Sequence, residues 1–224
     1  MCMHSKLHTL NIMIATGMVP VFYHDDTATA KSVMQACYDG GVRAFEFTNR
    51  GAFAHEVFAS LSKYAAEECP DMVLGVGTIV DAPTAAAYMQ MGARFVVGPL
   101  FNAEIARTCN RRQIPYIPGC GTASEIGWAQ EAGCDICKIF PGGSVGGPSF
   151  VSAVLAPMPW TRIMATGGVA PEEENLAAWF RAGVSCVGMG SRLLPKEAIA
   201  NRDWGRISRV CETVLLIIKK YRQT

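Results

Sequence analysis

The sequence predicts an α/β fold, a single-domain (β/α)8 TIM barrel that spans residues 1–224 and carries an extra N-terminal helix. The first observation is a recurring phrase in which a helical pattern ends at a glycine and a short apolar strand follows. The second is the alternation of eight strand-like runs with helical patterns. The third is the length of 224 residues, which matches the roughly 200 to 250 residues of one such barrel. An open doubly wound sheet is the structural alternative.

Eight apolar runs supply the predicted strands, and each is short and bounded by turn residues. Four of them end the phrases DGGVRAFEF, QMGARFVVG, EAGCDICKIF and RAGVSCVGMG, which begin at residues 39, 90, 131 and 181. The other four are MVPVFY from residue 18, MVLGVG from 72, IPYIPG from 114 and TRIMATGG from 161.

Helical patterns fill every gap between these runs. Strict alternation with short connections forces parallel strands joined by right-handed crossovers, and eight such units close best as a barrel. No GxGxxG follows the first strand and no GxxxxGK[ST] occurs anywhere, so nucleotide-binding folds have little support. The predicted helices are 5–15, 27–38, 54–68, 82–91, 103–113, 123–132, 148–155, 172–182 and 204–221.

Composition and charge favour a compact protein that binds a small molecule. Half of the residues are hydrophobic and 17% are charged, which is enough apolar material for a large core. The 20 Lys and Arg nearly balance the 19 Asp and Glu, so we expect no nucleic-acid partner. No apolar stretch reaches the roughly 18 residues of a membrane span, and no signal peptide is recognisable. We therefore expect a cytoplasmic protein with a small-molecule substrate and no membrane partner.

The nine cysteines form an odd set scattered through strand and helix patterns, which is typical of reduced thiols in a cytosolic core. Cys134 and Cys137 have the spacing of a redox pair. Such a pair normally opens a helix, however, and a three-residue offset along a strand would point the two side chains to opposite faces. His24 and His55 form no convincing ligand pattern with any cysteine or carboxylate. We therefore expect structural cysteines and no required metal.

Lys138 lies in the sixth predicted strand, between apolar neighbours in the run ICKIF. The active site of an α/β barrel lies at the carboxyl ends of its strands, so a polar residue in an apolar strand is a candidate. Burial disfavours the ammonium, lowers the pKa of the amine and leaves a nucleophile that can form a Schiff base with a carbonyl. In the alternative interpretation, Lys138 reaches solvent at the strand end or pairs with a structural acid.

Glu46 lies in the second predicted strand, where side-chain alternation directs Glu46 and Thr48 to one face and both phenylalanines to the other. Glu46 then enters the barrel, where burial raises the pKa of its carboxyl into the range useful for proton transfer; a structural ion pair is the alternative. Arg50 follows the strand at the end where substrate should bind. Its planar guanidinium can hold a carboxylate through two hydrogen bonds, although a surface arginine is the plainer interpretation.

Hydroxyls and glycines end three further strands. Thr78 ends the third strand and Thr166 the seventh, where their hydroxyls can orient a bound group or only fill the barrel. Barrels commonly gather backbone N–H groups around a phosphate after the seventh and eighth strands. The residues at these two places are Gly167 and Gly168 after the seventh strand and the run Gly188-Met189-Gly190-Ser191 after the eighth.

Six motifs occur in the order GVRAFEFTNRG, GVGT, VVGP, IPYIPGCGT, CKIFPGG and ATGG. Over about residues 18–194, the chain resembles the 2-keto-3-deoxy-6-phosphogluconate (KDPG) and 4-hydroxy-2-oxoglutarate (KHG) aldolase family. The signature is specific because E-x-T-x-R, K-x-F-P and T-G-G occur together, at residues 46–50, 138–141 and 166–168. The resemblance implies a class I aldolase without a cofactor, which cleaves KDPG to pyruvate and glyceraldehyde 3-phosphate. It also implies a homotrimer.

By this resemblance, Lys138 is the Schiff-base lysine and Glu46 moves protons beside it. The protonated imine accepts the electrons released when the C3–C4 bond breaks, so that an enamine forms in place of a free carbanion. The other implied contacts are Arg50 and Thr78 with the carboxylate, Pro99 and Phe140 as walls of the keto-acid pocket, and Thr166 with the hydroxylated part of the substrate.

Three segments depart from the family pattern. Residues 142–147 read GGSVGG where an Ala-Glu-Ala-Asn type of run is common, residues 119–122 read GCGT in place of GIST, and Arg192 stands where Trp is common. The lysine chemistry is untouched, so differences are expected at the distal end of the substrate. The alternatives are a KHG or phosphogalactonate type of aldolase, a phosphosugar isomerase or synthase barrel that uses Lys138 electrostatically, and a barrel that binds without catalysis.

Overall fold

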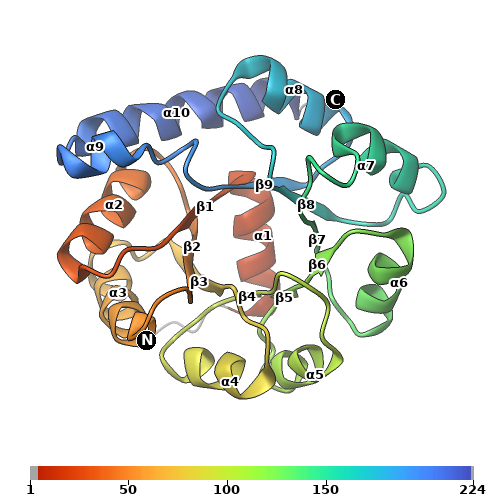
Figure 1. Ribbon diagram of the computed structural model, residues 1–224, viewed down its shortest axis with the longest axis horizontal. Helices are drawn as coiled ribbons and strands as arrows, with labels where there is room; N and C mark the ends of the chain where they lie inside the picture. Colours follow the sequence, from red (N-terminus) through yellow and green to blue (C-terminus); the bar gives the residue numbers. More distant parts are fainter. Residues whose placement is uncertain (1–4, 223–224) are drawn as a thin grey trace.

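The computed structural model describes residues 5–222, which form one nearly closed barrel of parallel strands surrounded by helices (Figure 1). The strand order is β5-β4-β3-β2-β1-β9-β8-β7-β6, so consecutive strands are neighbours in the sheet except β5 and β6, which stand at the two ends of the order. The predicted α/β barrel is confirmed, because a doubly wound sheet reverses its strand order. The strands are β1 Met18–Phe22, β2 Ala44–Thr48, β3 Val73–Gly77, β4 Val96–Val97, β5 Tyr116–Ile117, β6 Gly119–Cys120, β7 Cys137–Ile139, β8 Ile163–Thr166 and β9 Cys186–Met189.

The predicted fifth strand is divided into β5 and β6 by Pro118. Proline has no N–H to donate to the ladder, but the Pro118 carbonyl accepts a hydrogen bond of 2.9 Å from the N–H of Lys138. Before the proline the segment pairs with β4, and after it the segment pairs with β7. One continuous stretch of chain therefore closes the barrel and holds the strand that carries Lys138.

The nine predicted helices are all present, with boundaries within two residues of those expected. The structure adds a short helix, α9, whose five residues are too few to show a helical period in the sequence. Figure 1 shows α9 and the long α10 together on the side of the barrel formed by β1 and β9. The helices are α1 Lys6–Thr16, α2 Thr27–Asp39, α3 Ala54–Glu68, α4 Ala82–Gln90, α5 Ala103–Arg111, α6 Ala123–Glu131, α7 Gly147–Leu155, α8 Glu173–Arg181, α9 Lys196–Ala200 and α10 Trp204–Tyr221.

Helix α1 fills the end of the barrel at which the strands begin, and Figure 1 shows it crossing the centre of the ring of strands. The helix starts at Ser5, whose hydroxyl accepts a hydrogen bond from the His8 N–H, and it stops at Gly17, whose φ of 74° suits glycine. Leu10 and Met13 of α1 pack into an inner apolar cluster. The strand residues of this cluster are Val19, Ala44, Val73, Phe95, Val97, Ile117, Ile136, Met164 and Cys186.

Strand β2 shows the predicted alternation. Phe45 and Phe47 belong to the outer cluster between strands and helices, whereas Ala44 belongs to the inner cluster. With the amino-terminal half of the barrel filled by apolar side chains, the polar strand residues gather at the carboxyl ends.

Within residues 5–222, no helix is long and apolar enough to cross a membrane.

The eight cysteines in the described part of the chain are all free and buried. The expectation that Cys134 and Cys137 point to opposite faces is wrong, because both pack in the outer cluster. Cys134 precedes β7 and lies outside the extended strand, so strand alternation does not relate the two side chains.

Candidate active site

Lys138 lies inside the barrel, in the middle of β7, with only 6% of its surface exposed. Its Nζ lies 4.7 Å from the centre of the Phe140 ring. Among the described residues no carboxylate is within ion-pair distance of this amine, so neither alternative interpretation, solvent contact or a structural ion pair, describes it. Burial lowers the pKa of the Lys138 amine; the carboxylate of Glu46 opposes this shift and the charge of Arg50 adds to it.

Glu46 lies inside the barrel on β2 and is 3% exposed. Burial raises the pKa of its carboxyl, and the positive charges of Lys138 and Arg50 oppose the shift. The room for this side chain comes from Gly77 of β3, because a Cβ at that position would overlap the Glu46 carboxylate. Glu46 and Lys138 are therefore close enough for each to shift the pKa of the other.

The burial of Lys138 predicts a pH-dependent difference in stability between the protein and its Lys138→Met variant. The folded-state pKa lies below the ordinary value of 10.5, so between these two values the unfolded chain holds a proton that the folded chain has released. Stability of the parent protein therefore rises with pH across this window. The variant lacks this penalty and should melt higher than the parent at about pH 7, with the difference shrinking toward about pH 10.

Thermal melting of both proteins across this pH range measures the effect. The matched control is Lys219→Met, which removes an exposed lysine of α10 and should leave the pH profile of the parent unchanged. A melting difference between Lys138→Met and the parent that is constant with pH would contradict a depressed lysine pKa.

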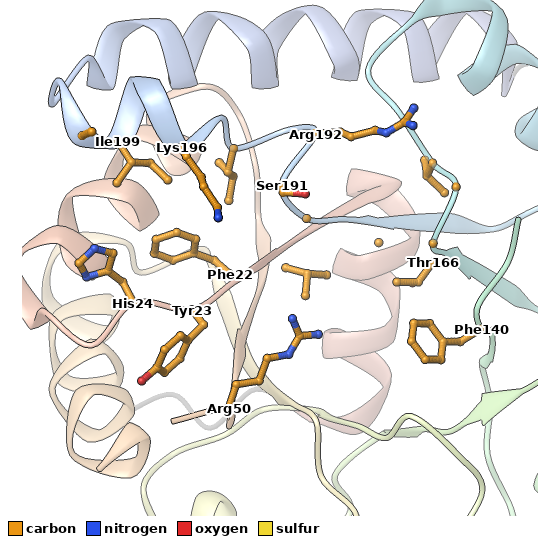
Figure 2. A pocket seen from close by; sticks show the side chains of 18 residues that line it. Phe22, Tyr23, His24, Arg50, Phe140, Thr166, Ser191, Arg192, Lys196 and Ile199 are labelled. Carbon is orange, nitrogen blue, oxygen red and sulfur yellow. The ribbon is translucent and has the colours of Figure 1, made fainter. Parts of the chain in front are cut away.

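Arg50 follows β2 and is tied to Thr78 by a hydrogen bond of 3.3 Å from its Nε to the Thr78 hydroxyl. Thr78 follows β3 with a φ of 63°, an uncommon value for a β-branched residue that is often found at functional positions. Figure 2 shows the Arg50 guanidinium directed into the pocket. The carboxyl ends of β2 and β3 thus bring a guanidinium and a hydroxyl into contact with each other, a combination suited to a carboxylate.

A cavity of about 740 Å³ opens over the carboxyl ends of β8, β9 and β1 (Figure 2). Of the predicted site residues, it is lined by Arg50, Phe140, Thr166, Gly167, Gly168, Gly190 and Ser191. Lys138, Glu46, Thr78 and Pro99 do not line it. The amine of Lys138 lies against the ring of Phe140, which forms part of the cavity wall, whereas Pro99 lies after β4 and packs its backbone against Gly119. The structure thus gathers most of the predicted site residues around one space, and Pro99 is not among those that line it.

The loops after β7 and β8 are joined by backbone hydrogen bonds. Gly142 N–H donates to the Thr166 carbonyl and Gly143 N–H to the Gly167 carbonyl, both at 2.8 Å. Gly167 and Gly168 have φ values of 86° and 83°, which favour glycine. The loop that departs from the family pattern therefore packs directly on the glycines that line the cavity.

Three buried side-chain oxygens at this end of the barrel have no hydrogen-bond partner among the described residues: Oε2 of Glu46, Oγ1 of Thr48 and Oγ1 of Thr166. Buried polar atoms are nearly always paired, so an unpaired group points to a bound partner. Gly188 of β9 leaves room for the Thr166 hydroxyl, which a Cβ there would overlap. Three unpaired oxygens in one barrel end suit a ligand rich in hydroxyl and carbonyl groups.

Several features of the site were not predicted from the sequence. Gly77 carries no periodic signal, and Gly188 was expected only as part of a phosphate-binding run. That each glycine leaves room for an opposite side chain appears only in the structure. Tyr23, His24 and Lys196 also line the cavity. The first two directly follow the end of β1, which is the one signal that could have identified them.

Within residues 5–222, no group of three or more His, Cys, Asp or Glu side chains is placed to hold a metal ion.

Comparison with known proteins assigns the family. Residues 10–210 match the family described as KDPG and KHG aldolase. A 2-dehydro-3-deoxy-phosphogluconate aldolase of Pseudomonas aeruginosa is 34% identical over 92% of this chain and 91% of its own. A 2-dehydro-3-deoxy-6-phosphogalactonate aldolase of Escherichia coli is 34% identical over 67% of this chain and 69% of its own.

A solved structure extends the comparison to three dimensions. The crystal structure of KDPG aldolase from Legionella pneumophila, with pyruvate captured as a covalent carbinolamine intermediate, has a TM-score of 0.83 and 27% identity to this chain. The match covers 92% of this chain and 97% of the other. Because the sequence and structural matches both span most of its length, this chain belongs to the KDPG and KHG aldolase family.

Proposed function

We propose that this chain cleaves KDPG to pyruvate and glyceraldehyde 3-phosphate, with Lys138 as the Schiff-base residue. The chain is an aldolase, a carbon–carbon lyase of the Schiff-base type. The observation that carries the assignment of the lysine is the buried amine of β7, whose pKa burial lowers and whose carboxyl neighbour has a raised pKa. Two groups with pKa values shifted toward each other are suited to nucleophilic attack and proton transfer near neutral pH.

The reaction begins when the neutral amine of Lys138 attacks C2 of the 2-keto acid. The carbinolamine loses water, and the product is a protonated imine. Glu46 then accepts the proton of the C4 hydroxyl, the C3–C4 bond breaks, and its electrons enter the imine to give an enamine and a free aldehyde. Protonation of the enamine at C3 and hydrolysis of the imine release pyruvate and return the amine of Lys138.

The remaining residues hold the substrate while these steps proceed. Arg50 and Thr78 bind the carboxylate, since the guanidinium and the hydroxyl are hydrogen-bonded to each other and Arg50 lines the cavity. The unpaired hydroxyl of Thr166 contacts the hydroxylated part of the substrate. Backbone N–H groups of the loops after β8 and β9, at Gly168 and Gly190, bind the phosphate.

A substrate panel tests this assignment. We expect the highest kcat/KM with KDPG and a value about 100-fold lower with the unphosphorylated sugar acid, because the distal phosphate supplies binding energy that positions the reacting carbons. Coupled assays of pyruvate release measure both values. The same panel includes KHG and the galactonate epimer of KDPG, since the Escherichia coli relative named above acts on a phosphogalactonate.

Each outcome of the panel selects one function. If kcat/KM is higher with the galactonate epimer or with KHG than with KDPG, that compound is the substrate. Binding of sugar phosphates with no pyruvate released and no imine trapped by borohydride would point to an isomerase or synthase barrel. Pyruvate binding without cleavage or proton exchange would point to a protein that binds without catalysis.

We also propose a homotrimer in the cytosol. Phe53, Val80 and Leu100 follow the consecutive strands β2, β3 and β4, so they lie at the same end of the barrel, and all three are large exposed apolar side chains. Such residues support a contact between subunits. The eight free, buried cysteines support a reducing compartment. Light scattering of the purified chain measures the assembly directly.

A further inference from the structure

We propose that Lys196, the first residue of α9, is a specificity-determining residue that binds the distal phosphate of the substrate. The inference rests on the proposed aldolase function and extends it to a part of the cavity for which sequence analysis named no residue.

The cavity lining carries positive charge. Among the described residues that line it are Arg50, Arg192 and Lys196, together with His24, and none is an Asp or Glu. A wall with several fixed positive charges and no negative one favours a ligand that is negatively charged at more than one point. A 2-keto acid with a distal phosphate has this charge distribution.

Lys196 lies at the end of the cavity that is far from the reacting amine. The cavity runs from Phe140, next to the reacting amine, across the ends of β8 and β9 to β1 and α9. Arg50 serves the reacting end, where it is bonded to Thr78. Lys196 lies on the α9 wall with Ile199, at the other end of this path. A substrate whose carbonyl meets Lys138 therefore extends its far end toward α9.

The ammonium of Lys196 is available to bind an anion. No carboxylate of the described residues lies within ion-pair distance of it, and Figure 2 shows its side chain extending into the pocket. In the same view the Arg192 side chain extends away from Lys196, past Ser191. A mobile ammonium with three donors can follow a phosphate without a fixed geometry, so Lys196 is the side chain best placed to complete the backbone site.

The test compares Lys196→Met with the parent protein on phosphorylated and unphosphorylated substrates. We expect KM for KDPG to rise about 10-fold with little change in kcat, because a charge-assisted contact to a remote group is lost. KM for the unphosphorylated sugar acid and the yield of borohydride-trapped pyruvate should match those of the parent. Lys196→Arg keeps the charge and should restore most of the affinity for KDPG, which a purely structural role of the lysine would not predict.

Two further measurements keep the outcome unambiguous. Lys219→Met, which removes an exposed charge of α10 outside the cavity, should behave as the parent does. Calorimetric titration should show that inorganic phosphate binds Lys196→Met several-fold more weakly than it binds the parent protein. If the parent cleaves KDPG and Lys196→Met has the same KM, the inference fails while the proposed function stands. If the parent traps no pyruvate, the proposed function fails, and the phosphate titration alone decides the role of Lys196.

Discussion

Lys138→Met is expected to form no borohydride-trapped adduct with pyruvate and to lose cleavage activity by about 10⁴-fold or more, the scale on which removal of a covalent nucleophile acts. Methionine has a similar length and no amine, so the variant tests the chemistry while the interior of the barrel stays filled. The amine lies in a strand that is hydrogen-bonded on both sides, to β6 and to β8, so the fold should be retained. Mass mapping after reduction should find the modified peptide of the parent at residue 138.

The control for this experiment is Lys219→Met, which should trap pyruvate as the parent does. A modified peptide that contains another lysine, or a trapped adduct on Lys138→Met, would refute the assignment of the Schiff base. Far-ultraviolet circular dichroism of the variant separates loss of chemistry from loss of fold. A variant that is folded, inactive and unmodified is the expected result.

The barrel itself follows from the sequence because each element satisfies its own local rule. Strand β2 alternates, and its phenylalanines pack outside while Glu46 enters the barrel. The nine longer helices begin and end within two residues of the helical patterns in the sequence. Two features could not be predicted in this way. The break at Pro118 depends on which neighbour each half of the strand pairs with, and α9 is shorter than the window that a helical period requires.

The candidate site was predictable where a polar residue interrupts an apolar strand. Lys138 and Glu46 are of this kind, since burial of a charge needs a reason. Gly77 was not predictable, because a glycine shows only that a Cβ is absent and not which side chain occupies the space. Lys196 was not predictable, because an exposed lysine is an ordinary surface residue until the cavity beside it is seen.

Glu46→Gln is expected to lower kcat by about 10² to 10⁴-fold, the range that one positioned acid or base contributes. The glutamine keeps the shape of the side chain, so it fits the space that Gly77 leaves open, but it cannot accept or return a proton. Lys138 remains, and reduction with borohydride after long incubation should still trap pyruvate on it. The combination of retained imine and lost turnover separates proton transfer from nucleophilic attack.

Exchange of the methyl protons of pyruvate for deuterium gives the sharpest measure of this role, because the exchange requires only imine formation, loss of a C3 proton and its return. Nuclear magnetic resonance should show exchange in the parent and in Glu56→Gln, a matched change at an exposed acid of α3, and almost none in Glu46→Gln. Exchange at the parental rate in Glu46→Gln would assign the proton transfers to another group. Since burial raises the pKa of the Glu46 carboxyl, the exchange rate of the parent should also rise with pH as this carboxyl ionises, and this acidic limb should be absent from Glu46→Gln.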